Sequence, residues 1–79
     1  MSGFLILYRR RSGERQVFEF PGADGPVDAA RARLRYERDS RFRDSGIEIA
    51  AISSDSLETV MRTHSRYFRG TEVDFLKSA

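Results

Sequence analysis

The stretch that decides the fold is Gly3-Phe-Leu-Ile-Leu-Tyr-Arg9, close to the amino terminus. Its central residues are all apolar or aromatic, and it has neither the length nor the caps of a buried helix. These features favour a strand buried on both faces. After a short glycine-containing link, residues 15–20 form a second extended run with Phe18 and Phe20 on one side. Together the two runs predict a β-hairpin over residues 3–20.

Downstream of the hairpin the sequence predicts a first helix. Pro26 suits the first helical position, and the residues after it are good helix formers. Val27, Ala30 and Leu34 recur at helical spacing and form one apolar stripe, which is expected to face the core. The helix is therefore expected over about residues 26–39.

A third strand and a second helix follow. Residues 47–53 alternate in the manner of a strand. Asp55, followed three residues later by Glu58, has the spacing of a helix cap and predicts a helix over about residues 56–69. The apolar positions of this helix have the strongest helical periodicity in the chain: Leu57, Val60, Met61, His64, Tyr67 and Phe68. Residues 71–79 are expected to form a short edge strand or an ordered tail.

These elements predict a single α+β domain, residues 1–79, with the order ββαβα. The expected sheet has three antiparallel strands in the order 2-1-3, or a short fourth strand at the carboxyl end, and both helices lie on one face. Leu5, Leu7 and Val17 would then lie on the uncovered face, which would serve as a protein interface. Alternatively, the carboxyl-terminal segment folds across that face.

Composition narrows the classes of protein. A chain of 79 residues can form one small domain with a thin core. It has no cysteine, which excludes disulfides, thiolate metal sites and cysteine nucleophiles. No apolar run of about 18 residues and no secretory leader is present, so a soluble cytoplasmic protein without a membrane partner is expected.

The residues with catalytic potential form no recognisable constellation. His64 is the only histidine and lies on the apolar stripe of the second helix, where a structural role is expected. Neither Ser65 nor Asp55 has a spacing that would make it a catalytic partner. The acids match no metal-ligand motif, and no glycine-rich phosphate loop occurs. The chain is therefore expected not to be an enzyme and to hold no cofactor or metal, and an enzyme that uses His64 is the third and weakest alternative.

The compact basic cluster consists of Arg9, Arg10, Arg11 and Arg15, at the expected tip of the hairpin. A basic hairpin can track a phosphate backbone, so nucleic-acid binding is the alternative function. Two ordinary explanations compete with it. Charged residues protect a hairpin tip from edge-to-edge pairing, and a GC-rich genome supplies arginine codons. The net charge of +2 does not by itself indicate nucleic acid.

Several stretches resemble those of small uncharacterised accessory proteins of GC-rich bacteria and their phages. They are Leu5-Ile-Leu-Tyr-Arg-Arg10, Glu48-Ile-Ala-Ala-Ile-Ser53, Asp55-Ser-Leu-Glu58 and Arg62-Thr-His-Ser-Arg-Tyr-Phe68. The resemblance implies a compact accessory protein and assigns no functional residues.

The absence of a catalytic constellation, the small size and the expected uncovered sheet face favour a non-enzymatic interaction or regulatory protein. It would bind or inhibit a larger protein, as a phage-type accessory factor does. Its partner is expected to be another protein or a second copy of itself, paired through the uncovered sheet face or a sheet edge. Nucleic acid is the alternative partner.

Overall fold

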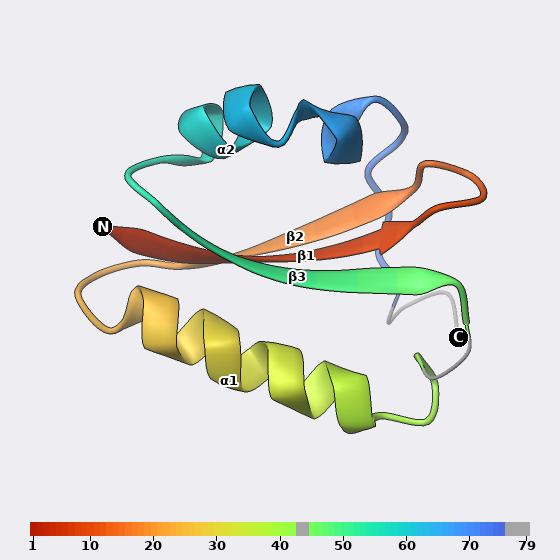
Figure 1. Ribbon diagram of the computed structural model, residues 1–79, viewed down its shortest axis with the longest axis horizontal. Helices are drawn as coiled ribbons and strands as arrows, with labels where there is room; N and C mark the ends of the chain where they lie inside the picture. The colour runs from red at the N-terminus through yellow and green to blue at the C-terminus, as the bar shows by residue number, and fades with distance from the viewer. Residues whose placement is uncertain (43–44, 76–79) are drawn as a thin grey trace.

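The computed structural model describes residues 1–42 and 45–75. Its elements run in the order expected, as shown in Figure 1. The three strands are β1 (Ser2–Arg9), β2 (Arg15–Phe20) and β3 (Ile47–Ser54). The helices are α1 (Gly25–Arg38), α2 (Leu57–Thr63) and the short 3-10 helix η1 (Ser65–Phe68). The ββαβα order is confirmed.

The sheet has three strands in the order β2-β1-β3, and both strand pairs are antiparallel. The order 2-1-3 is therefore confirmed. Phe4, Leu5, Ile6 and Leu7 of the central strand are 0% exposed. The uniform apolar character of β1 follows from this position, because a central strand covered on both faces has no side in contact with water.

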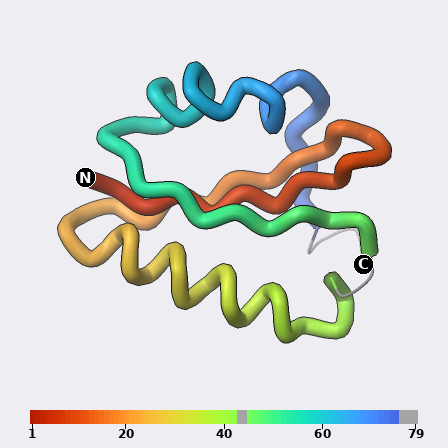
Figure 2. Tube along the Cα trace, in the orientation of Figure 1, coloured from red at the N-terminus to blue at the C-terminus, as the bar shows by residue number. Residues whose placement is uncertain are grey.

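The two helices lie on opposite faces of the sheet, as Figures 1 and 2 show. Leu5 and Leu7 pack beneath α1, whereas Phe4 and Ile6 pack beneath α2 and η1. The prediction that both helices share one face is therefore wrong. The physical reason lies in β1 itself: it is apolar on both faces, and each face must be removed from water.

The side of α1 that packs on the core is opposite to the side predicted from the sequence. Its buried residues are Gly25, Ala29 and Ala32, whereas Val27 and Leu34 are 53% and 46% exposed. A Cβ atom on Gly25 would overlap the carbonyl oxygen of Phe20. The start of α1 therefore lies too close to the sheet backbone for large side chains on its inner side.

The second helical region is shorter and more broken than expected. Ser56, not Asp55, is the N-cap of α2, and its Oγ accepts a hydrogen bond of 3.1 Å from the Thr59 N–H. The α-helix ends at Thr63, and a 3-10 turn carries the chain on. This tighter turn directs Tyr67 inward, where it is 5% exposed.

The carboxyl-terminal segment follows the outer edge of β2 and forms a single parallel bridge between Arg15 and Glu72. The Arg15 N–H donates to the Thr71 carbonyl (2.9 Å), and the Arg15 carbonyl accepts from the Val73 N–H (2.8 Å). Phe75 then reaches the α1 side of the sheet and is 8% exposed. The fourth strand thus amounts to one bridge within the described residues, and residues 76–79 of the predicted segment lie outside them.

Candidate interaction surfaces

The three residues expected on an uncovered face are not exposed together. Leu5 and Leu7 are fully buried beneath α1. Val17 stands opposite Ile6 in the strand register and packs on the α2 side of the sheet. The expectation that these residues share an exposed face is wrong, because α1 covers one side and α2 with η1 covers the other.

The four arginines of the hairpin do not form one free basic surface. The Arg9 guanidinium lies 5.2 Å from the centre of the Phe75 ring, with its Nε 3.8 Å from Glu14 Oε1. Arg10 Nε lies 3.4 Å from a Glu48 carboxylate oxygen. Arg11 is exposed and has no ion pair with any described residue.

Arg15 lies apart from the hollow that the other three arginines line. Its side chain is only 13% exposed, and its guanidinium donates a 2.8 Å hydrogen bond to the Gly70 carbonyl. The same guanidinium lies 4.9 Å from the centre of the Phe68 ring, on the α2 side. Arg15 therefore anchors the chain after η1 to the sheet.

The shallow hollow at the hairpin end is lined by Arg9, Arg10, Arg11, Ser45 and Gly46.

His64 caps the carboxyl end of α2. Its ring stacks on Tyr67 with centres 6.5 Å apart, and its Nδ1 lies 2.9 Å from Thr63 Oγ1. Among the described residues no three acidic or histidine side chains are close enough together to hold a metal ion. These contacts give His64 a packing role at the junction of α2 and η1.

A polar cluster that the sequence did not reveal surrounds the Glu48 carboxylate of β3. Glu48 Oε2 accepts hydrogen bonds from the Tyr67 hydroxyl (2.5 Å) and from Arg66 Nη2 (2.6 Å). Tyr8 and Tyr67 pack edge to face at 5.1 Å. The hydrogen bond from Tyr67, aided by Arg66 and Arg10, holds the pKa of Glu48 below its ordinary value. Burial, with the adjacent carboxylate, raises the pKa of the Tyr67 hydroxyl.

This arrangement predicts a pH-dependent contribution to stability. A carboxyl group whose pKa is lowered on folding stabilises the fold above its unfolded pKa, and that stabilisation is lost as the pH falls through the folded value. Glu48→Gln is expected to lower the free energy of unfolding by about 1–3 kcal/mol at pH 7. The difference from the wild type should shrink below about pH 4.5.

Urea denaturation of both proteins between pH 2.5 and 7 measures this effect. Glu19→Gln is the matched control, because Glu19 is exposed and has no ion pair with a described residue. A Glu48→Gln difference that stays constant over the whole range would show that the carboxylate charge contributes nothing.

The outer side of α1 carries an apolar stripe. Val27, Ala30 and Leu34 lie at i, i+3 and i+7, so they share one side of the helix, and all three are exposed. Arg31 and Arg38 lie along one flank of this stripe, and neither has an ion pair with a described residue. We call these five residues the α1 outer surface. It combines the spacing of a helix-pairing seam with a positive flank.

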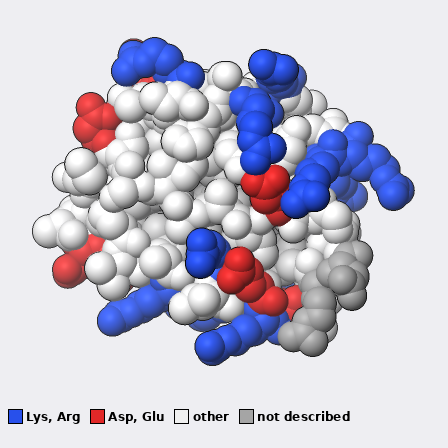
Figure 3. Space-filling view, in the orientation of Figure 1, with Lys and Arg blue, Asp and Glu red and all other residues white. Residues whose placement is uncertain are grey.

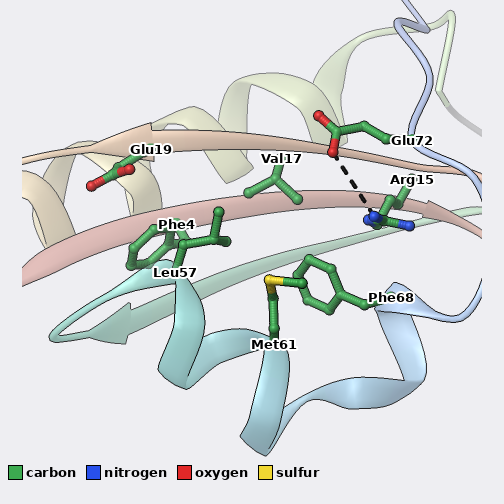
Figure 4. Close-up of a pocket in the computed structure, with 8 residues that line it drawn as sticks. All are labelled: Phe4, Arg15, Val17, Glu19, Leu57, Met61, Phe68 and Glu72. Atoms are coloured by element: carbon green, nitrogen blue, oxygen red, sulfur yellow. Dashed lines mark ion pairs between the residues drawn. The ribbon is translucent and has the colours of Figure 1, made fainter.

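A smaller hollow of about 190 Å³ lies between β2 and α2, as Figure 4 shows. Leu57 and Met61 form its α2 side and are 39% and 43% exposed. The ion pair between Arg15 and Glu72, 3.9 Å apart, closes one end. This hollow is large enough for one side chain of a partner and too small for a helix.

Comparison with known proteins gave no match among family models, curated proteins or solved structures. In the part of the chain that the structure describes, no helix is both long enough and apolar enough to span a lipid bilayer.

Sequence reasoning missed the α1 outer surface and the Glu48 cluster for different reasons. The stripe of Val27, Ala30 and Leu34 is visible in the sequence, but the usual rule assigns such a stripe to the core. Gly25 and Ala29 on the other side of the helix were the signal for the opposite orientation, since small residues permit close approach to a sheet. Glu48 and Tyr67 are brought together only by the fold.

Proposed function

We propose that the protein is a small non-enzymatic interaction protein, an accessory factor that binds and regulates a larger protein through the α1 outer surface. The observation that supports this most is the orientation of α1, which buries its small residues and exposes Val27 and Leu34. The resemblance to small accessory proteins of GC-rich bacteria and their phages is consistent with this role.

The spacing and charge of the surface indicate the chemistry of the partner. Residues at i, i+3 and i+7 are the positions through which one amphipathic helix contacts another. The positive flank formed by Arg31 and Arg38 disfavours a second copy of α1 at this site, because like charges would then meet. An amphipathic helix with acidic residues beside its apolar seam complements both features.

A synthetic acidic helix tests the proposal directly. The probe is a fluorescein-labelled peptide of about three heptads, with leucine at the seam positions and glutamate on both flanks. We expect it to bind the wild-type protein in fluorescence anisotropy, with an affinity that falls as salt rises. Leu34→Asn is expected to weaken binding at least about tenfold, which corresponds to about 1.4 kcal/mol.

Met61→Asn is the matched control, because Met61 is 43% exposed, close to the 46% of Leu34, but lies on the α2 side. A double variant, Arg31→Glu with Arg38→Glu, should reduce the salt dependence as well as the affinity. Equal binding by wild type and Leu34→Asn, or a loss caused by Met61→Asn instead, would contradict the proposed surface.

The alternative function, nucleic-acid binding by the hairpin arginines, has less support. Arg9 and Arg10 each have an acidic partner, and Arg15 is mostly buried. Binding to nucleic acid depends on the number of phosphates that free cations neutralise, and a guanidinium that is buried or paired with a carboxylate is less available for this. We therefore place this function second.

A further inference from the structure

The outer edge of β3 presents a row of free backbone groups from Ile49 to Ser53. β3 runs for eight residues, and its register with β1 is continuous from Ile47 to Ser54. The Arg10 N–H donates to the Gly46 carbonyl (3.3 Å), one step beyond the last strand pair. Hydrogen-bonded and non-hydrogen-bonded pairs alternate in an antiparallel ladder. The N–H and C=O groups of Ile49, Ala51 and Ser53 therefore point away from β1.

The two edges of the sheet differ in whether described residues cover their outward backbone groups. On β2 the chain itself covers the outward groups of Arg15 with residues 71–73. On β3 no described residue forms a backbone hydrogen bond to the outward groups of Ile49, Ala51 or Ser53. Proteins usually protect a free edge with proline, lysine or a bulge. β3 has none of these, so the described part of the chain leaves this edge open to another strand.

Charge does not protect the edge either. Glu48 is the only charged residue of β3, and its carboxylate is bound by Tyr67 and Arg66. Figure 3 views the molecule from the side on which β3 lies in front, and much of the surface between α1 and α2 there is uncharged. A strand can therefore approach β3 without desolvating an unpaired charge.

We propose that β3 pairs with β3 of a second copy, antiparallel and centred on Ala50, to form one continuous sheet. This inference does not depend on the proposed function of α1. When a strand pairs antiparallel with the same strand of a second copy, residues that lie on the same face of the sheet must stand opposite each other. The outward N–H and C=O groups of the odd-numbered residues must also hydrogen-bond to each other. Centring on Ala50 satisfies both conditions: Ile49 lies opposite Ala51 of the second copy, and Ala50 lies opposite itself.

The side chains along this register suit a close pairing. Ala50 occupies the two-fold axis, where opposed residues of a non-hydrogen-bonded pair approach most closely and a small side chain fits best. Ile47, Ile49 and Ile52 are only half-buried, although Leu7 and Phe4, the β1 partners of Ile49 and Ile52, are fully buried. A second copy would cover the exposed parts of these isoleucines. Apolar burial would thus add to the backbone hydrogen bonds.

The helices fit the same arrangement. α1 packs mainly against β1 and β3. With strands about 4.8 Å apart, α1 lies about 5 Å from the two-fold axis. The two α1 helices would then be about 10 Å apart and antiparallel, a normal packing distance. Each flank beside the buried side of α1 carries both signs of charge: Asp28 with Arg35 on one, and Arg33 with Glu37 on the other.

Sedimentation equilibrium of the wild-type protein tests the pairing, and disulfide formation in two cysteine variants tests its register. We expect the wild type to have the mass of two chains at about 100 μM, well above the dissociation constant of a specific dimer. Because the chain has no native cysteine, Ala50→Cys should form an interchain disulfide under mild oxidation, since the opposed Cα atoms would be about 4.5 Å apart. Ala51→Cys is the matched control, since its Cα atoms would be about 8 Å apart, beyond disulfide reach.

A proline variant separates loss of pairing from loss of folding. The Ala51 N–H points outward, so Ala51→Pro removes a hydrogen bond to the second copy and none to β1. We expect it to keep the circular dichroism spectrum of the wild type and to raise the dimer dissociation constant at least about tenfold. Ala51→Ser, which keeps the N–H, should remain dimeric.

A wild-type protein that stays monomeric at about 100 μM would overturn the proposal. This holds even if β3 then pairs with a strand of a different protein. A dimer in which Ala51→Cys crosslinks and Ala50→Cys does not would overturn the register. A folded Ala51→Pro protein with undiminished dimerisation would show that copies associate through another surface.

Discussion

Gly3→Ala is expected to unfold the protein, or to lower its free energy of unfolding by more than about 3 kcal/mol, which exceeds the usual cost of overpacking. A Cβ atom at Gly3 would overlap the backbone carbonyl of Gly25 and approach Ala29 Cβ to 2.8 Å. Backbone atoms at the start of α1 cannot move aside as a flexible side chain can. The whole helix would have to shift away from the sheet, and a domain of this size rarely has more than about 3–5 kcal/mol of stability.

Gly22→Ala is the matched control for this effect. Gly22 has a φ of +88°, and a Cβ atom there would meet nothing within 4 Å. Alanine at this position therefore bears only the strain of the left-handed conformation, about 1–2 kcal/mol. Urea denaturation of both variants compares the two causes. If Gly3→Ala proved as stable as Gly22→Ala, α1 would not be packed against β1 as closely as described.

Leu5→Ala is the second variant for which a large loss is expected. Leu5 is 0% exposed and belongs to the buried cluster that joins β1, α1 and Phe75. Removing a buried leucine side chain leaves a cavity and costs about 2–5 kcal/mol. That loss is comparable to the whole stability of so small a domain, so we expect the variant to be largely unfolded at 37 °C.

Leu34→Ala makes the same chemical change at an exposed position. Leu34 is 46% exposed on the outer side of α1, and substitutions at such surface sites usually change stability by less than about 0.5 kcal/mol. Thermal denaturation of the pair therefore reports the orientation of α1. If Leu34→Ala cost as much as Leu5→Ala, the helix would present the side predicted from the sequence, and the α1 outer surface would not exist.

Local signals in the sequence were sufficient for the elements and their order. The run from Gly3 to Arg9 identified the central strand, because only a strand enclosed by neighbours can be apolar at successive positions. The alternation in residues 47–53 and the helix formers after Pro26 likewise correspond to β3 and α1. The hairpin followed by a helical crossover then determined the strand order.

Only the tertiary structure decided which face of the sheet each helix covers and which side of the helix it buries. The stripe of Val27, Ala30 and Leu34 predicted the wrong inner side for α1, because periodicity does not reveal how closely a helix can approach a sheet. That distance depends on Gly3 and Gly25, which are far apart in the sequence and meet in the fold. The residues buried with Leu5 and Leu7, and the partners of Glu48, depend on the same placement. Contacts between residues distant in the chain are a property of packing, and no local pattern encodes them.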